Sequence, residues 1–311
     1  MDRPAPDPAP RGPGKCEPTL RTFDLRGLPC GVWDFGAPYA GAPVALAVHG
    51  YLDTGGSFAA VSEHTHAHLL AANWRGHGPG PRLAGGTSFH QLDHLKDLGL
   101  LWTALSRVDL APELLVGHSM GTSIALMFAA ARPELVPRLL LLDGAGALPE
   151  SPGGQIRRLG SLLRSEEAGP RPFRPFPSVE AARDRIRINN PGLSPRGADR
   201  MVRFSGETQA DGTWSFYFDS RLRGPSPIRF SEEFWQQVCG QISCPTSALL
   251  GGKSPLTAHL PVIEERLSRI PNGTCQILPG AGHHIHLDHP DAVGQAMDRL
   301  LDPPLAPTGS Q

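Results

Sequence analysis

Short runs of apolar residues alternate along this chain with segments long enough to form helices. The run Val44–Val48 contains no polar residue, which is typical of a strand that is buried on both faces of a sheet. Similar short runs recur at His68–Trp74, Leu114–Val116, Leu139–Leu142, Ser247–Leu250 and Cys275–Leu278. Together these six runs predict an α/β fold in which helices cover one large, mostly parallel sheet.

The segments around these runs add a hairpin and several helices to the prediction. Leu20–Leu25 and Gly31–Phe35 alternate apolar and polar residues on either side of Arg26 and Gly27, as the strands of an antiparallel hairpin do. Pro290 stands where a proline suits the start of a helix. The helices that we expect are Phe89–Leu105, Met120–Ala131, Ala258–Ile270 and Asp291–Leu301.

The stretch 147–240 interrupts the alternation of strands and helices. It separates two predicted sheet strands, contains the clusters GPRPFRPFP and NNPGLSPRG, and is too long for a single crossover. We therefore expect an inserted helical cap on an α/β core formed by 18–146 and 241–302. The aromatic stretch from Trp214 to Phe218 either lines an acyl pocket or packs the small core of the cap itself.

The two ends and the composition narrow the class of protein further. Residues 1–17 are rich in Pro and Gly and lack the apolar stretch of a secretory signal, so we expect a disordered leader there, and a tail at 303–311. Lys and Arg number 29 against 30 Asp and Glu, a balance that argues against a nucleic-acid partner or an anionic membrane surface.

Membrane spans and disulfide scaffolds are also disfavoured. The longest apolar stretch, Leu114–Ala131, is interrupted by Gly117, His118 and Ser119, whereas a spanning helix needs about 18 apolar residues or more. The five cysteines include no C-x-x-C pair. A reducing compartment, the cytoplasm, is therefore the expected location.

The sequence LLVGHSMG contains the pattern G-x-S-x-G between a predicted buried strand and a predicted helix. This context places Ser119 on a sharp strand-to-helix turn, where Gly117 and Gly121 avoid steric conflict. The amino end of the following helix would direct free N–H groups and a partial positive charge at the site where negative charge develops. The pattern therefore predicts that Ser119 is a nucleophile.

A second segment, VHGY, ends the first buried strand and could supply a backbone donor. An oxyanion hole needs two N–H groups that converge on one point. Gly50 lets the chain turn after the strand, so that the N–H of Tyr51 can join the N–H of Met120. Taken alone, the segment is equally consistent with an ordinary glycine turn.

A histidine-rich segment, GAGHHIH, follows the last predicted strand. His283 is our candidate general base, because a neutral imidazole can take the serine proton and return it to a leaving group. Spacing alone does not choose among His283, His284 and His286. A zinc site at these three, or at His64, His66 and His68, is disfavoured because neither group comes with a fourth ligand or a Cys pair. We expect no metal and no cofactor.

Five motifs in this order, VALAVHGYLD, NWRGHG, LLVGHSMG, LLLLDG and GAGHHIHLDHP, resemble the α/β-hydrolase superfamily over about residues 20–302. Within it the chain is most similar to the serine-hydrolase-like group. The resemblance implies a capped α/β-hydrolase fold and a Ser–acid–His triad in that chain order. By motif, Ser119 is the nucleophile, His283 is the base, and the N–H groups of Tyr51 and Met120 form the oxyanion hole.

The acid of the triad departs from the pattern of many members of the superfamily. Where Asp is usual after the penultimate core strand, this chain has Ser254, and a hydroxyl brings no charge to stabilise an imidazolium. Some members place the acid one strand earlier, where Asp143 follows Leu139–Leu142. We predict Asp143 as the acid, although Asp at this position is also frequent without a catalytic role.

These residues predict a serine hydrolase that cleaves a carboxylic ester or a similar small acyl substrate through an acyl-serine intermediate. Two alternatives remain open from the sequence. One is a non-catalytic protein of the same fold that binds a small ligand under its cap, and the other is an acyltransferase that uses the same serine. Neither the substrate nor the oligomeric state follows from the residues.

Overall fold

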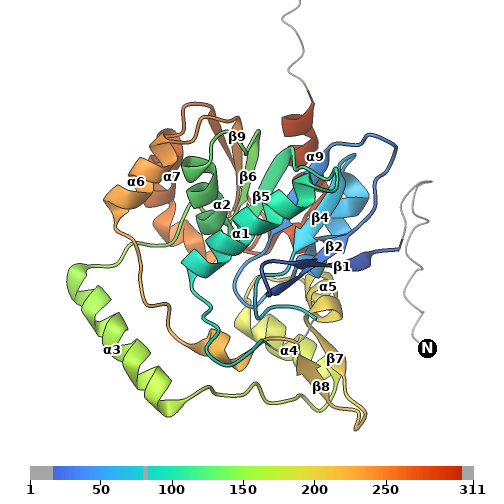
Figure 1. Ribbon diagram of the computed structural model, residues 1–311, viewed down its shortest axis with the longest axis vertical. Helices are drawn as coiled ribbons and strands as arrows, with labels where there is room; N and C mark the ends of the chain where they lie inside the picture. The colour runs from blue at the N-terminus through green and yellow to red at the C-terminus, as the bar shows by residue number, and fades with distance from the viewer. Residues whose placement is uncertain (1–16, 80–82, 303–311) are drawn as a thin grey trace, which may run out of the picture.

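An eight-stranded sheet forms the centre of the molecule in the computed structural model, which describes residues 17–79 and 83–302 (Figure 1). The predicted leader and tail, 1–17 and 303–311, lie outside these residues except for Glu17. The strands, in spatial order, are β1 (Thr19–Asp24), β2 (Pro29–Asp34), β4 (His68–Ala72), β3 (Val44–Val48), β5 (Leu114–His118), β6 (Leu139–Leu142), β9 (Thr246–Gly251) and β10 (Gly273–Leu278).

The pairing of these strands confirms the predicted α/β class. β1 and β2 form the expected antiparallel hairpin, and β2 also pairs antiparallel with β4. From β4 to β10 every neighbouring pair of strands is parallel. The carboxyl ends of the parallel strands therefore meet at one edge of the sheet, which is where α/β folds bind their ligands.

Helices cover both faces of the sheet and divide the apolar core into two layers. On one face, Trp102, Phe128, Trp235 and Ile263 belong to a single buried cluster that joins the first group of helices to the sheet. On the other face, Phe58 and Met297 belong to the second cluster. The first group is α1 (Gln91–Ser106), α2 (Met120–Ala131), α6 (Glu232–Gly240) and α7 (Leu260–Ser268); the second is the 3₁₀ helix η1 (Gly55–His64), α8 (Ile285–Asp288) and α9 (Pro290–Leu301).

One predicted strand differs in burial from the expectation. The run Cys275–Leu278 belongs to β10, but β10 is the edge strand of the sheet and is exposed along most of its length. The neighbouring run, Ser247–Leu250, belongs to β9, the strand next to β10, and is largely buried. The expectation of burial on both faces was wrong for β10, because an edge strand has a neighbour on one side only.

An insertion lies between β6 and β9, in the region expected to form the cap. The insertion contains α3 (Pro152–Ala168), α4 (Val179–Asn189), α5 (Pro195–Ser205), β7 (Gly206–Thr208), β8 (Trp214–Phe216), the 3₁₀ helix η2 (Ser220–Arg223) and α6. Helices α4 and α5 and the hairpin of β7 and β8 pack around Trp214, with Phe176 and Phe216 against it. These aromatic residues thus pack the core of the insertion itself.

The last part of the insertion rejoins the body of the molecule. Trp235 of α6 is fully buried in the larger core cluster, so this helix packs with α2 and α7. Among the described residues, no helix is both long enough and apolar enough to cross a membrane.

Candidate active site

Three side chains from distant parts of the sequence meet at the carboxyl edge of the sheet. Ser119 follows β5, Asp143 follows β6, and His283 lies between β10 and α8. Nε2 of His283 is 2.9 Å from Oγ of Ser119, and Nδ1 of His283 is 2.5 Å from Oδ2 of Asp143. When Nδ1 donates its proton to the carboxylate, Nε2 is left free to accept the proton of the serine.

The turn that carries Ser119 depends on close packing around two glycines. Ser119 has a φ of 52° and a ψ of −115°, a conformation that L-residues rarely adopt. A Cβ atom at Gly117 would lie 2.7 Å from the carbonyl oxygen of Gly121, and one at Gly121 would lie 2.4 Å from that of Val48. A larger residue therefore has no room at either glycine, and α2 begins immediately after Ser119.

The carboxylate of Asp143 is held by three partners and is 1% exposed. Besides His283, its Oδ1 accepts a hydrogen bond from the N–H of Gly251 at 2.8 Å. Its Oδ2 also accepts one from Oγ of Ser254 at 2.5 Å. Ser254, the residue at the usual Asp position, therefore contacts the carboxylate that follows the neighbouring strand. This contact was not anticipated from the sequence.

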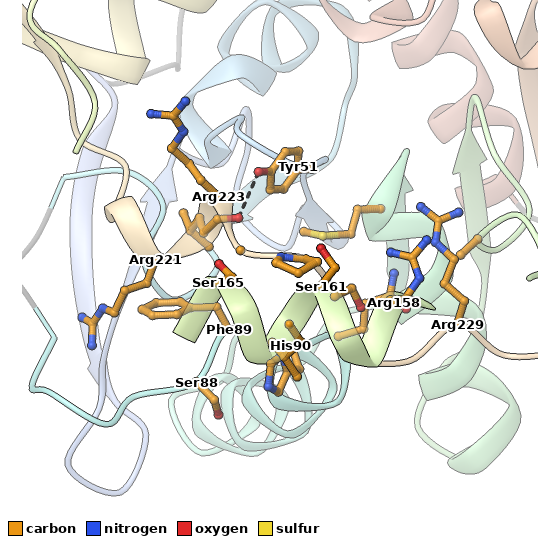
Figure 2. Close-up of a pocket in the computed structure, with 18 of the residues that line it drawn as sticks. Tyr51, Ser88, Phe89, His90, Arg158, Ser161, Ser165, Arg221, Arg223 and Arg229 are labelled. Atoms are coloured by element: carbon orange, nitrogen blue, oxygen red, sulfur yellow. Dashed lines mark hydrogen bonds between the residues drawn. The ribbon is translucent and has the colours of Figure 1, made fainter. Parts of the chain in front are cut away.

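The two predicted oxyanion donors both border the cavity that contains Ser119. Met120 is the first residue of α2, and Tyr51 follows Gly50 after β3. A Cβ atom at Gly50 would lie 3.0 Å from Cβ of Ser119, so the chain after β3 passes close to the serine. The side chain of Tyr51 extends away from this turn, and its hydroxyl donates to the carbonyl of Leu222 at 2.9 Å (Figure 2).

A cavity of about 1320 Å³ opens beside Ser119 and His283. Its wall combines the strand-end loops of the core with α3 and residues 220–226 of the insertion. Figure 2 shows Tyr51 and the side chains of Ser161 and Ser165 around this space. A space of this size accommodates a small molecule, which agrees with the expected class of substrate.

The other histidines of the GHHIH segment point into the interior. His284 and His286, with His118 and Asp53, form a buried group whose ligand-type atoms all lie within 4.8 Å of one another, close enough for a metal ion to draw them together. Nε2 of His286 lies 3.3 Å from Oδ2 of Asp53 and 3.0 Å from Oγ of Ser57. Through these contacts the group forms a buried hydrogen-bonding network. Sequence reasoning missed the group as a whole, because its members come from three separate segments.

Burial controls the charge of this network. It lowers the pKa of His284 to about 3 and the pKa of His118 well below its usual range. Burial alone would raise the pKa of Asp53, but the hydrogen bond and the electrostatic interaction with His286 lower it to about 2. Both His118 and His284 are thus neutral near pH 7, while Asp53 is ionised.

The alternative histidine group, His64, His66 and His68, does not converge on one point. His66 pairs with Asp298, with 3.2 Å between Nδ1 and a carboxylate oxygen. His68 pairs with a different carboxylate, with 2.7 Å between its Nε2 and Oδ1 of Asp34. These contacts occupy the imidazoles of His66 and His68 with separate carboxylates.

Comparison with known proteins identifies the family of the chain. The family model described as the alpha/beta hydrolase fold matches residues 43–290. The chain therefore belongs to the alpha/beta hydrolase family, as its motifs predict.

Several individual proteins are similar over most of the chain. A serine hydrolase-like protein of Danio rerio is 28% identical over 90% of this chain and 86% of its own length, and one of Dictyostelium discoideum is 26% identical over 80% and 72%. Other similar proteins are named as esterases or lipases. The crystal structure of a hypothetical protein of Pseudomonas aeruginosa has a TM-score of 0.77 at 24% identity, with 91% of this chain and 97% of that chain covered. The last likeness shows the fold alone.

Proposed function

We propose that the protein is a serine hydrolase that cleaves a carboxylic ester or a similar small acyl compound. The continuous contact from Oγ of Ser119 through His283 to Asp143 carries the proposal, because it provides a nucleophile, a base and an orienting anion in one line. The esterases and lipases among the similar proteins support the same class of reaction.

The reaction follows from the positions of these three groups. Nε2 of His283 takes the proton of Ser119 as Oγ attacks the carbonyl carbon, and a tetrahedral intermediate forms. The imidazolium then returns the proton to the leaving oxygen, and the C–O bond of the ester breaks. Water, activated by the same imidazole, attacks the acyl-serine and releases the acid. Asp143 stabilises the imidazolium in both halves of the reaction.

Backbone N–H groups complete the proposed site. The N–H groups of Met120 and Tyr51 are assigned to the oxyanion of the tetrahedral intermediate. The amino end of α2 adds a partial positive charge at the same position. In known cases the removal of one oxyanion donor raises the barrier by about 3 kcal/mol.

Two measurements test the proposal. Purified protein should react rapidly with a fluorophosphonate probe and should hydrolyse p-nitrophenyl esters of short acyl chains, because only an activated serine does both. Ser119→Ala should remove probe labelling and lower kcat by at least about 10⁴-fold. Ser123→Ala, which changes another serine of the cavity wall, is the matched control and should retain labelling.

The outcome separates the proposal from its alternatives. A wild-type protein that neither reacts with the probe nor hydrolyses any ester would contradict the proposal and favour a ligand-binding role. Rapid labelling with slow hydrolysis that accelerates when an alcohol or amine acceptor is added would instead indicate acyl transfer.

A further inference from the structure

The wall of the active-site cavity is strongly basic. The carboxylates among its described lining residues are Asp143, which contacts His283, and Glu166. Against these stand six guanidinium groups, although the whole chain has a net charge of −1. The six are Arg158, Arg164, Arg171, Arg221, Arg223 and Arg229. Basic residues are thus concentrated in the place where a substrate must bind.

Arg158 and Arg229 come from different segments but lie together at one end of the cavity (Figure 2). Gln155 of α3 joins the two segments, because its Nε2 donates to the carbonyl of Pro227 at 2.5 Å and its Oε1 accepts from the N–H of Arg229 at 3.0 Å. The backbone segments that carry the two arginines are therefore joined by hydrogen bonds that do not use the guanidinium groups.

The charges of this pair are incompletely neutralised by the protein. Arg158 forms one ion pair, with Glu150 at 3.2 Å, and its Nε is buried without a hydrogen-bond partner among the described residues. Nη1 of Arg229 donates to the carbonyl of Leu148 at 3.4 Å, and no ion pair of Arg229 is found in the described part of the chain. Burial and the positive charge of Arg158 lower the pKa of Arg229, and the carboxylate of Glu150 offsets this only in part. An anion between the two would relieve this repulsion.

Arg221, at the opposite side of the cavity, is better compensated. Arg221 forms a close ion pair with Asp219 at 2.6 Å, and it also donates to backbone carbonyls of the loop before α1. Its guanidinium thus already has a structural role. Arg158 and Arg229 differ from it: the Nε of Arg158 has no partner among the described residues, and the guanidinium of Arg229 has one long hydrogen bond to a carbonyl there.

We propose that Arg158 and Arg229 form a subsite for an anionic group, so that the preferred substrate is an acyl compound that carries a carboxylate or a similar anion besides its scissile bond. Paired guanidinium groups suit this chemistry because their planar N–H donors match the two oxygens of a carboxylate. The inference rests on the proposed hydrolase function for its substrate, but the anion subsite itself can be measured without turnover.

Matched esters test the subsite. Mono-p-nitrophenyl glutarate and p-nitrophenyl valerate differ mainly in a terminal carboxylate, and 4-carboxyphenyl valerate places the anion on the leaving group instead. If the subsite faces the acyl group, kcat/KM for mono-p-nitrophenyl glutarate should exceed that of p-nitrophenyl valerate by about tenfold or more. If it faces the leaving group, 4-carboxyphenyl valerate should show it through its sensitivity to Arg229→Gln, because its phenol is a poorer leaving group than p-nitrophenol and the absolute rates are not comparable. Arg229→Gln should lower the anionic value by about tenfold to a hundredfold, the usual effect of a lost hydrogen bond to a charged group.

Controls distinguish a binding role from general damage. Arg229→Gln should change kcat/KM for p-nitrophenyl valerate by less than about threefold, since a neutral ester makes no such contact. Arg157→Gln, on the exposed side of α3, should leave all three esters unchanged. Arg158→Gln should reproduce the Arg229→Gln pattern, with thermal unfolding measured because it also removes the ion pair with Glu150.

Two results would overturn the inference while the hydrolase proposal survives: equal turnover of neutral and anionic esters, or an equal loss for both in Arg229→Gln. If no ester is hydrolysed, the proposed function fails, and calorimetric binding of glutarate to the Ser119→Ala protein decides the subsite alone. Binding that Arg229→Gln abolishes would support it, and the absence of binding would overturn it.

Discussion

At the scale of single residues, the position of the proposed acid is the most informative feature of the site. Sequence comparison within the superfamily draws attention to Ser254 as a departure, because a hydroxyl cannot supply the charge of an aspartate. In the structure Ser254 donates to Oδ2 of Asp143, the same oxygen that faces His283. The two positions therefore act together: one strand end carries the anion, and the next supplies a donor that orients it.

Substitutions at these two positions should differ greatly in effect. Asp143→Asn should lower kcat for p-nitrophenyl esters by about 10⁴-fold, because an amide neither stabilises the imidazolium nor favours the correct tautomer of His283. Ser254→Ala should cost only about tenfold, the effect of one lost hydrogen bond. A larger loss for Ser254→Ala than for Asp143→Asn, measured on folded proteins, would contradict the assignment of Asp143 as the acid.

The residues of the site differ in how far sequence alone could predict them. Ser119, His283 and Asp143 each stand in a local motif next to a predicted strand, and the structure brings their side chains into contact. The contact of Ser254 with Asp143 depends on the register of β6 against β9, which no local pattern specifies. The buried network around Asp53 was missed because its members are distant in the sequence, and no local pattern indicates that they meet.

At the scale of elements, the junction of β5 and α2 is the most tightly constrained. Continuous apolar runs predicted the central strands correctly, and the helix at Met120–Ala131 has the expected bounds. Less local features were harder to predict. The helix expected at Ala258–Ile270 is divided into the 3₁₀ helix η3 (Pro255–His259) and α7, because Pro261 occupies the first turn of α7 and favours a new helix start there. The exposure of β10 depends on its place at the edge of the sheet.

A methyl group tests the constraint at the junction. Gly121→Ala should lower the free energy of unfolding by about 1–3 kcal/mol, as overpacking usually does, because the new Cβ would meet the carbonyl of Val48. Gly240→Ala is the matched control, since no atom lies within 4 Å of the Cβ built there. Chemical denaturation of both variants measures the difference, and equal stability of the two would show that α2 can move away from β3.

At the scale of the whole molecule, buried neutral histidines connect folding with pH. Burial lowers the pKa of His49 to about 4 and the pKa of His94 and His284 to about 3, and it places that of His77 and His118 well below their usual range. Histidine in an unfolded chain titrates near 6.5. As the pH falls below that value, protons therefore bind to the unfolded chain first and stabilise it.

The stability of the protein should consequently decrease on acidification. It should change little above pH 6.5 and fall progressively from there towards pH 4, with Tm lower by more than about 5 °C at pH 4.5. Asp53, whose pKa is about 2, stays ionised in the folded protein throughout this range and adds to the slope only near pH 4, where the carboxyl of the unfolded chain begins to bind protons. Thermal unfolding at constant ionic strength measures the profile.

Two variants connect the profile with the buried histidines. His284→Gln should reduce the slope between pH 6.5 and 4, whereas the exposed His259→Gln should leave it unchanged. A flat profile for the wild-type protein would mean that the buried imidazoles take up protons without unfolding.

The order of the three reacting groups along the polypeptide also has a consequence for biosynthesis. The alcohol and the anion emerge from the ribosome before the insertion is made, whereas the imidazole that joins them follows after it, as the last of the three. On the proposed mechanism, a nascent or prematurely terminated chain that ends before His283 lacks the base and has an inert serine. Hydrolytic capacity would then arise only once translation has passed β10 and the late strands have docked.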